Sequence, residues 1–284
     1  MNIKVICPVC RKKGEIEVSE TILKNAPRGL VAINIAKGTI CSDSFIVYVD
    51  KNLNIRDYFT ADFQIDLPKL FLEESSEEGM ITDEDLTKYG INIDLIKLNI
   101  SPTILAFILR GVFLGEKIII VLDNERLIDT LSNFLINSTK KSFKIDMAIV
   151  STEEYENNRK DYKKSLVIGK NELLNDRRKI INPKNIPIER RIVQQFFEEL
   201  DDKMSLFLIR NEIQKAFEFS NFIAKKLRDK GEEKLDINIL NSELQDKYQI
   251  KITPVYLKFL FDIVENNFKE KVPTSMKLVL KTIF

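Results

Sequence analysis

The beginning of the chain is patterned as short β-strands. Ile16 and Val18 alternate with glutamates, which is the period of a strand with one buried face. Residues 45–49 (FIVYV) are aromatic or β-branched, and a DKN turn separates them from an expected return strand over residues 55–63. We therefore predict a small β module over residues 1–66.

The middle of the chain alternates apolar strands with helices. Ser101-Pro102 predicts a helix start, because serine is a good cap and proline suits the first helical position, and Gly115 predicts the end of that helix. Strands separated by helices favour parallel pairing with right-handed crossovers. We predict a small α/β domain over residues 99–183, with strands at residues 117–122, 144–150 and 165–168.

Residues 67–98, between these two regions, are acidic. Thr82 and Asp85 have the spacing of a capping box and predict a short helix. We interpret the stretch as an acidic linker with one short helix, and the alternative is a contact for a basic partner. The acidic cluster consists of Glu73, Glu74, Glu77 and Glu78.

Residues 184–284 carry apolar side chains at helical spacing. One stripe runs over residues 188–200 and another over residues 206–227. Further helices are expected to start at Asp236 and at Thr253-Pro254. The many phenylalanines fit core packing, so we predict an all-α C-terminal region.

Composition excludes several classes of chemistry. The chain has no histidine, which removes Ser-His-Asp and Cys-His catalysis and histidine-ligated zinc hydrolases. Its nine glycines form neither a dinucleotide nor a triphosphate loop motif. With 44 basic and 43 acidic residues the net charge is +1, so bulk charge does not favour a polyanion.

Localisation follows from apolar runs and cysteine count. The longest apolar run is interrupted by Arg110 and falls short of the ~18 residues of a membrane span. The N-terminus lacks an apolar signal core, and three cysteines are too few for a disulfide scaffold. We expect a cytoplasmic protein with no transmembrane segment; its oligomeric state is not encoded in these patterns.

The strongest local motif is Cys7-Pro8-Val9-Cys10. A C-P-x-C turn places two thiolates on one side of a tight loop, as in a zinc knuckle, and Cys41 and Asp43 complete a four-ligand set. Three interpretations stay open: a structural zinc ribbon, a decayed ribbon without metal, and a redox C-x-x-C. The redox reading is disfavoured, because the motif leads into β structure and not into a helix.

Residues 1–66 also resemble the N-terminal module of a family of Asgard-type archaeal proteins. That family has C-x-x-C followed by a C-x-H-x-F segment and a V-D-K-N turn. Here the corresponding run is Cys41-Ser42-Asp43-Ser44-Phe45, followed by Val49-Asp50-Lys51-Asn52, so Asp43 takes the place of the family histidine. The resemblance implies a zinc-ribbon-like head and no particular activity.

Together these regions predict an α+β multidomain protein. It has a small β zinc-ribbon-like head, an acidic linker, a small α/β middle with parallel strands, and an all-α C-terminal region.

A possible enzyme site lies near Asp123. Asp123 and Ser151 follow successive predicted parallel strands, at the edge where open α/β sheets bind ligands. A carboxylate-dependent enzyme centred near Asp123 is therefore one alternative, and simple helix capping by Asp123 or Asn124 and by Ser151 is favoured over it. The acidic neighbours are Glu125, Glu153 and Glu154.

Two features bear on nucleic acid. Residues 240–261 have the outline of a helix-turn-helix, but Lys258 is the only basic residue on the second helix, where DNA readers need several. The basic run Arg177-Arg178-Lys179 could touch phosphate, although such runs are more often solvated loops. A nucleic-acid-binding transcriptional regulator is the first alternative, and the carboxylate-dependent enzyme is the second.

We therefore expect a non-catalytic interaction protein, an adaptor or regulator. The archaeal resemblance suggests a small GTPase or a membrane-traffic-like assembly as its partner. Zinc, if bound, would be structural, with no catalytic residues assigned.

Overall fold

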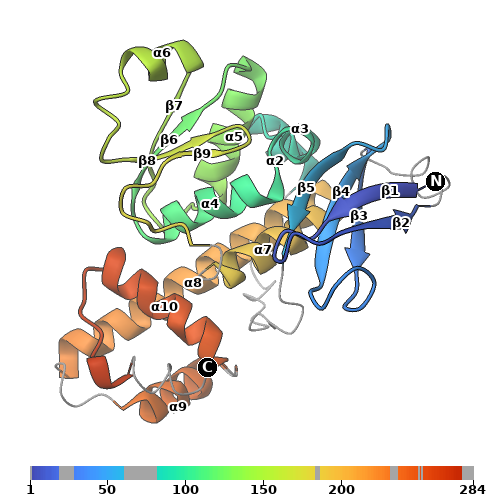
Figure 1. The fold of residues 1–284 in the computed structure, drawn as a ribbon. Helices are drawn as coiled ribbons and strands as arrows, with labels where there is room; N and C mark the ends of the chain where they lie inside the picture. Colours follow the sequence, from blue (N-terminus) through green and yellow to red (C-terminus); the bar gives the residue numbers. More distant parts are fainter. Residues whose placement is uncertain are drawn as a thin grey trace.

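The protein has the predicted α+β architecture, with antiparallel strands first, a sheet containing parallel strands in the middle, and helices at the end (Figure 1). The computed structural model describes residues 2–18, 29–60, 82–182, 186–230, 236–248, 250 and 252–276. The predicted acidic cluster at positions 73–78 lies outside these ranges.

The head consists of a hairpin and a separate three-stranded antiparallel sheet. Ile3 pairs with Ile16 in the hairpin, which confirms the alternation expected there. Gly14 is needed in the same strand, because a Cβ at that position would lie 2.9 Å from Cγ1 of Ile40. The strands are β1 (Asn2–Ile6), β2 (Lys13–Glu17), β3 (Leu30–Ile35), β4 (Phe45–Asp50) and β5 (Ile55–Phe59).

Strand β4, at the centre of the three-stranded sheet, is buried on both faces. Phe45, Val47 and Val49 pack in a core shared with the hairpin. Ile46 and Tyr48, which point to the other face, belong to the main core of the molecule. The continuous apolar run FIVYV is therefore the pattern of a strand between two layers.

The head is joined to the helices by specific contacts. The Tyr48 ring meets the Phe197 ring edge-on with centroids 5.8 Å apart. The backbone N–H of Thr103 donates to the Asp57 carboxylate at 3.1 Å, and the Arg190 guanidinium donates to the Thr60 carbonyl at 2.9 Å. The head and the helical core therefore share a packed boundary.

The middle region is a four-stranded sheet in the order β7-β6-β8-β9. Its first three strands are parallel, as predicted, and β9 pairs antiparallel with β8. The sequence prediction missed β9, because three residues after a tight turn are too short to show a period. The elements are α4 (Pro102–Phe113), β6 (Lys117–Val121), α5 (Glu125–Ser138), β7 (Asp146–Val150), α6 (Thr152–Asn157), β8 (Leu166–Gly169) and β9 (Leu173–Asn175).

Helix α4 has the ends that its sequence predicts. The Ile104 N–H donates to the hydroxyl of Ser101, and Gly115 has a φ of +64° just past the last turn. Within the helix, a Cβ at Gly111 would lie 2.8 Å from Cδ1 of Ile118. Gly111 therefore allows α4 to pack closely against the sheet.

The remaining helices surround α8, which contacts α3, α5, α7 and α10. The capping box of Thr82 and Asp85 is confirmed, and so is the cap at Thr253. Helix α3 is buried on one face and was not predicted within the acidic stretch. The helices are α2 (Asp83–Lys88), α3 (Ile93–Asn99), α7 (Pro187–Glu198), α8 (Asp202–Lys230), α9 (Ile237–Tyr248) and α10 (Pro254–Asn266).

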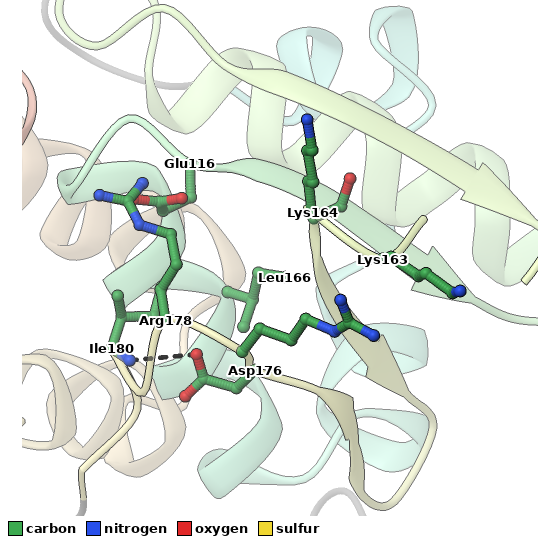
Figure 2. A pocket seen from close by; sticks show the side chains of 9 residues that line it. Glu116, Lys163, Lys164, Leu166, Asp176, Arg178 and Ile180 are labelled. Carbon is green, nitrogen blue, oxygen red and sulfur yellow. Dashed lines mark hydrogen bonds and ion pairs between the residues drawn. The ribbon is translucent and has the colours of Figure 1, made fainter. Parts of the chain in front are cut away.

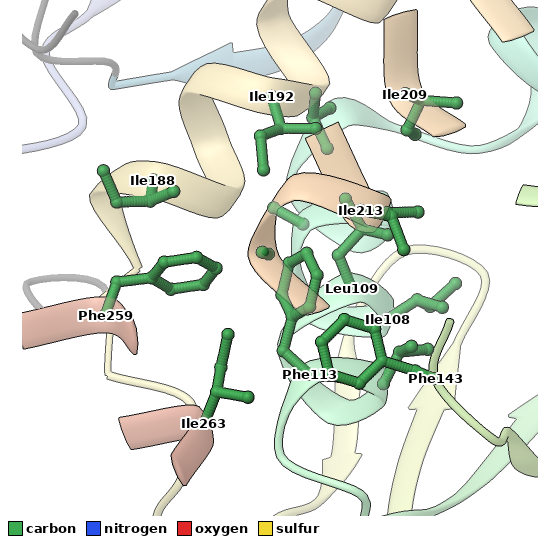
Figure 3. Close-up of a cluster of buried hydrophobic side chains, with 14 of the residues drawn as sticks. Ile108, Leu109, Phe113, Phe143, Ile188, Ile192, Ile209, Ile213, Phe259 and Ile263 are labelled. Atoms are coloured by element: carbon green, nitrogen blue, oxygen red, sulfur yellow. The ribbon is translucent and has the colours of Figure 1, made fainter. Parts of the chain in front are cut away.

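Aromatic and branched side chains fill the space between α4, α7, α8 and α10 (Figure 3). Phe113 lies at its centre, with its ring edge-on to Phe143 at 5.4 Å and to Phe259 at 5.1 Å. The prediction that the phenylalanines of this region form core is confirmed.

A buried ionic cluster crosses the same region. Arg110 of α4 donates to Glu189 of α7 at 3.1 Å and to Asp262 of α10 at 2.7 Å. Burial raises the pKa of Glu189, and the Arg110 charge opposes that rise. Arg110, which merely interrupts an apolar run in the sequence, thus ties three helices together.

Taken one at a time, the helices within the described ranges are too short or too polar to cross a membrane; α3 and α4 reach the required length and apolarity only as a pair, and they meet at 108°.

Candidate metal centre and other functional sites

The first half of the candidate metal centre is the turn after β1. The N–H groups of Val9 and Cys10 both point at the sulfur of Cys7, at 3.4 and 3.5 Å. Arg11 has a φ of +63° and donates to the Cys7 carbonyl, which closes the turn before β2. Converging N–H groups on one sulfur stabilise a thiolate, which is the form that binds metal.

The second half is the loop between β3 and β4. Gly38 has a φ of +90°, and its N–H donates to the Cys41 carbonyl at 2.7 Å. The N–H of Asp43 points at the Cys41 sulfur at 3.4 Å. The loop therefore repeats, around Cys41, the N–H to sulfur arrangement of the first turn.

The structure brings all four predicted ligands together: Cys7, Cys10, Cys41 and Asp43 offer donor atoms that lie within 4.8 Å of one another. An oxygen of Asp43 lies 3.4 Å from the sulfur of Cys7 and 3.6 Å from that of Cys41. Tetrahedral zinc, with Zn–S near 2.3 Å and Zn–O near 2.0–2.2 Å, requires sulfur and oxygen to be about 3.6 Å apart. The donor set therefore fits a zinc-like ion in identity and in spacing.

The four side chains also perturb one another. Hydrogen bonds from Cys10 and Cys7 hold the pKa of Asp43 below its usual range. The Asp43 amide lowers the pKa of Cys41, but burial and the neighbouring sulfurs outweigh it and raise that pKa to about 12. The four side chains repel one another when all are ionised, because they lie so close together. A divalent cation between them would stabilise their ionised forms.

The carboxyl edge of the parallel sheet is organised for capping. The Asp123 carboxylate accepts from the backbone N–H of Thr152 at 2.8 Å and from its hydroxyl at 2.7 Å. Ser151 caps α6 through the Glu154 N–H, and Asn124, one of the two residues considered, caps α5. Ser151 therefore has the capping role favoured from the sequence, whereas Asp123 does not cap α5 and instead holds Thr152, the first residue of α6.

The expected helix-turn-helix corresponds to α9 and α10. Most of α10 is buried, and its Asp262 is engaged with Arg110 in the core. A recognition helix must present one face to the DNA groove, so the packing of α10 does not suit that role.

The amino edge of the same sheet holds a basic cavity that the sequence did not single out as a site (Figure 2). It has a volume of about 350 Å³ and opens where β6 and β8 begin and β9 ends. Glu116 and Arg178 form an ion pair on one wall, and the N–H of Ile180 donates to Asp176 at 3.0 Å (Figure 2). In the sequence only the basic run at positions 177–179 stood out. The other residues that line the cavity come from distant segments, so no local pattern connects them with that run.

Comparison of the chain with protein-family models, with curated proteins and with solved structures found no match.

Proposed function

We propose that this protein is a non-catalytic interaction protein, an adaptor or regulator, whose head is held in shape by a structural zinc ion. The convergence of Cys7, Cys10, Cys41 and Asp43 carries the proposal. When bound, zinc supplies a cross-link between the hairpin and the loop of the second sheet. Four protein ligands leave no open position on the ion, which favours a structural role over a catalytic one.

The partner surface that we assign is the groove beside the first cysteine turn. It has a volume of about 390 Å³ and lies between the hairpin and edge strand β5. The N–H of Ile6 donates to the Tyr58 hydroxyl at 3.1 Å, which holds the two walls together. Val9, at the tip of the turn, is 60% exposed, and Ile6 is 36% exposed.

The chemistry of this groove fits a protein segment. The exposed side chain of Ile6 lines the groove together with the arginines at positions 11 and 56, and the exposed Val9 follows Pro8, which also lines it. A partner with apolar and acidic side chains would bury the apolar side chains and pair with the arginines. A small GTPase or a membrane-traffic-like assembly, as suggested by the archaeal resemblance, stays the predicted partner class.

The alternative of an enzyme centred near Asp123 has less support. Both oxygens of that carboxylate already accept hydrogen bonds from Thr152. These hydrogen bonds give the carboxylate a structural role at the start of α6, which favours the non-catalytic interpretation.

The proposal is tested by quantitative affinity purification from native lysate. Val9→Asp places a charge on the turn beside the groove and should abolish the recovery of a protein that the wild type retains in stoichiometric amount. Ile239→Asp is the matched control, since Ile239 is 49% exposed on α9, and it should retain that protein. Recovery that is identical for all three chains, or a turnover abolished by Asp123→Asn, would refute the proposal.

A further inference from the structure

The basic cavity at the amino edge of the sheet has a larger neighbour. The second cavity, of about 460 Å³, extends along α6 and the loop that follows it. Lys163 and Arg177 line both cavities. The two hollows are therefore adjacent, with these two cations on the boundary between them, and are together called the basic groove.

Among the described residues, the groove is lined by five cations without an ion pair, and the second cavity also contains the carboxylate of Glu156. Within the described residues, the side chains of Lys163, Lys164 and Arg177 form no ion pair, and all three residues are exposed. The same holds for Arg159 and Lys160 in the second cavity. The chain as a whole has a net charge of only +1, so this concentration of positive charge is local.

The acids that line the first cavity are engaged elsewhere. Glu116 pairs with Arg178. The carboxylate of Asp176 accepts the backbone N–H groups of Ile180 and Ile181, at 3.0 and 2.8 Å. These contacts fix the wall of the cavity and leave Lys163, Lys164 and Arg177 available for an anion. Figure 2 shows the side chains of Lys163 and Lys164 extending in different directions from consecutive positions.

The second cavity adds an aromatic surface. Tyr155 and Tyr162 are stacked, with ring centroids 6.1 Å apart and planes 18° from parallel. Both rings line the cavity; Tyr155 is buried and Tyr162 is half-buried. The Tyr162 hydroxyl donates to Glu154 at 3.3 Å. The ring is therefore held by the stack against Tyr155 and by this hydrogen bond.

We propose that this groove binds a nucleotide, with the phosphates at Lys163 and Arg177 and the base against Tyr162. Clustered lysine and arginine side chains bind phosphate oxygens, and base stacking on an aromatic ring tolerates any base. Side chains from two segments take the place of the glycine-rich backbone loop that the sequence lacks. The ligand is either a free nucleoside triphosphate or the 5′-phosphorylated end of a single strand.

The test is titration of the full chain with three probes: adenosine triphosphate, inorganic tripolyphosphate and a 5′-phosphorylated hexanucleotide. We expect adenosine triphosphate or the hexanucleotide to bind more tightly than tripolyphosphate, and affinity to fall with salt. The tighter of the two identifies the source of the nucleotide. No binding of either at millimolar concentration, or binding of anionic lipid vesicles alone, would overturn the proposal.

Variants separate the phosphate and base contacts. Lys163→Ala with Arg177→Ala should weaken all three probes at least tenfold, while Lys170→Ala with Lys258→Ala, two exposed lysines outside the groove, should leave them unchanged. Tyr162→Leu should weaken the nucleotide several-fold and spare tripolyphosphate. Equal effects of Tyr162→Leu on both ligands, or none on either, would contradict the assignment of the base.

Discussion

An oxygen of Asp43 lies 3.4 Å from the sulfur of Cys7, although 36 positions separate the two residues. One belongs to the turn after β1 and the other to the loop before β4. A metal ion held by both would close a long loop and cross-link two sheets that share no backbone hydrogen-bond ladder.

Purified protein is expected to contain about one zinc ion per chain, because four ligands form one closed site. Cys41→Ser and Asp43→Ala should each lose most of it, and Asp43→His should retain it, since imidazole is an accepted zinc ligand. Ser42→Ala is the matched control. Elemental analysis after gel filtration measures the ratio of zinc to protein. Wild-type protein without zinc would favour the interpretation as a decayed ribbon that binds no metal.

Removal of the metal should loosen the head before the helices. The ligands lie in the β1–β2 turn and the β3–β4 loop, whereas α4 is held by its own core. Hydrogen exchange after treatment with a chelator is expected to rise in residues 2–17 and 36–44 and to change little in residues 102–113. Uniform acceleration along the chain would show that the ion has no local role.

Asp123→Asn is expected to lower the melting temperature at neutral pH, because Asp123 holds the first residue of α6. Hydrogen bonds from the Thr152 hydroxyl and amide lower the pKa of Asp123 in the folded state. Its contribution is therefore fully present above the unfolded value of about 3.9 and is lost as pH falls through the lower folded value. Melting curves at pH 7 and pH 3.5 should show a smaller difference between variant and wild type at the lower pH; a constant difference would contradict this origin.

Arg110→Leu should destabilise the fold by about 3–5 kcal/mol, because it leaves the buried carboxylate of Glu189 without its cation. Denaturant unfolding at neutral pH measures the change. Arg228→Ala is the matched control: Arg228 pairs with Glu270 at 3.1 Å at the surface, and its loss should cost about 1 kcal/mol or less. Equal costs for the two variants would show that the buried cluster adds nothing specific.

Local signals in the sequence were enough to predict local structure. Ser101-Pro102, Thr253-Pro254 and the Thr82–Asp85 box place helix starts because caps and prolines act within one turn. The C-x-x-C spacing identifies half of the metal centre for the same reason.

Contacts between distant segments were beyond these signals. Arg110 meets partners 79 and 152 positions away, and an isolated arginine in an apolar helix does not reveal them. The basic groove likewise combines residues near positions 116, 163 and 177. Helix α3 was missed because the acidic composition before it masks a short apolar stripe.

The two-sided burial of β4 has a practical consequence for any attempt to excise the head. A fragment that ends after Phe59 would expose the side chains of Ile46 and Tyr48 to solvent. The remaining helical fragment would expose the apolar face that packs against them. Both pieces should aggregate, so dissection of this protein calls for point substitutions within the intact chain.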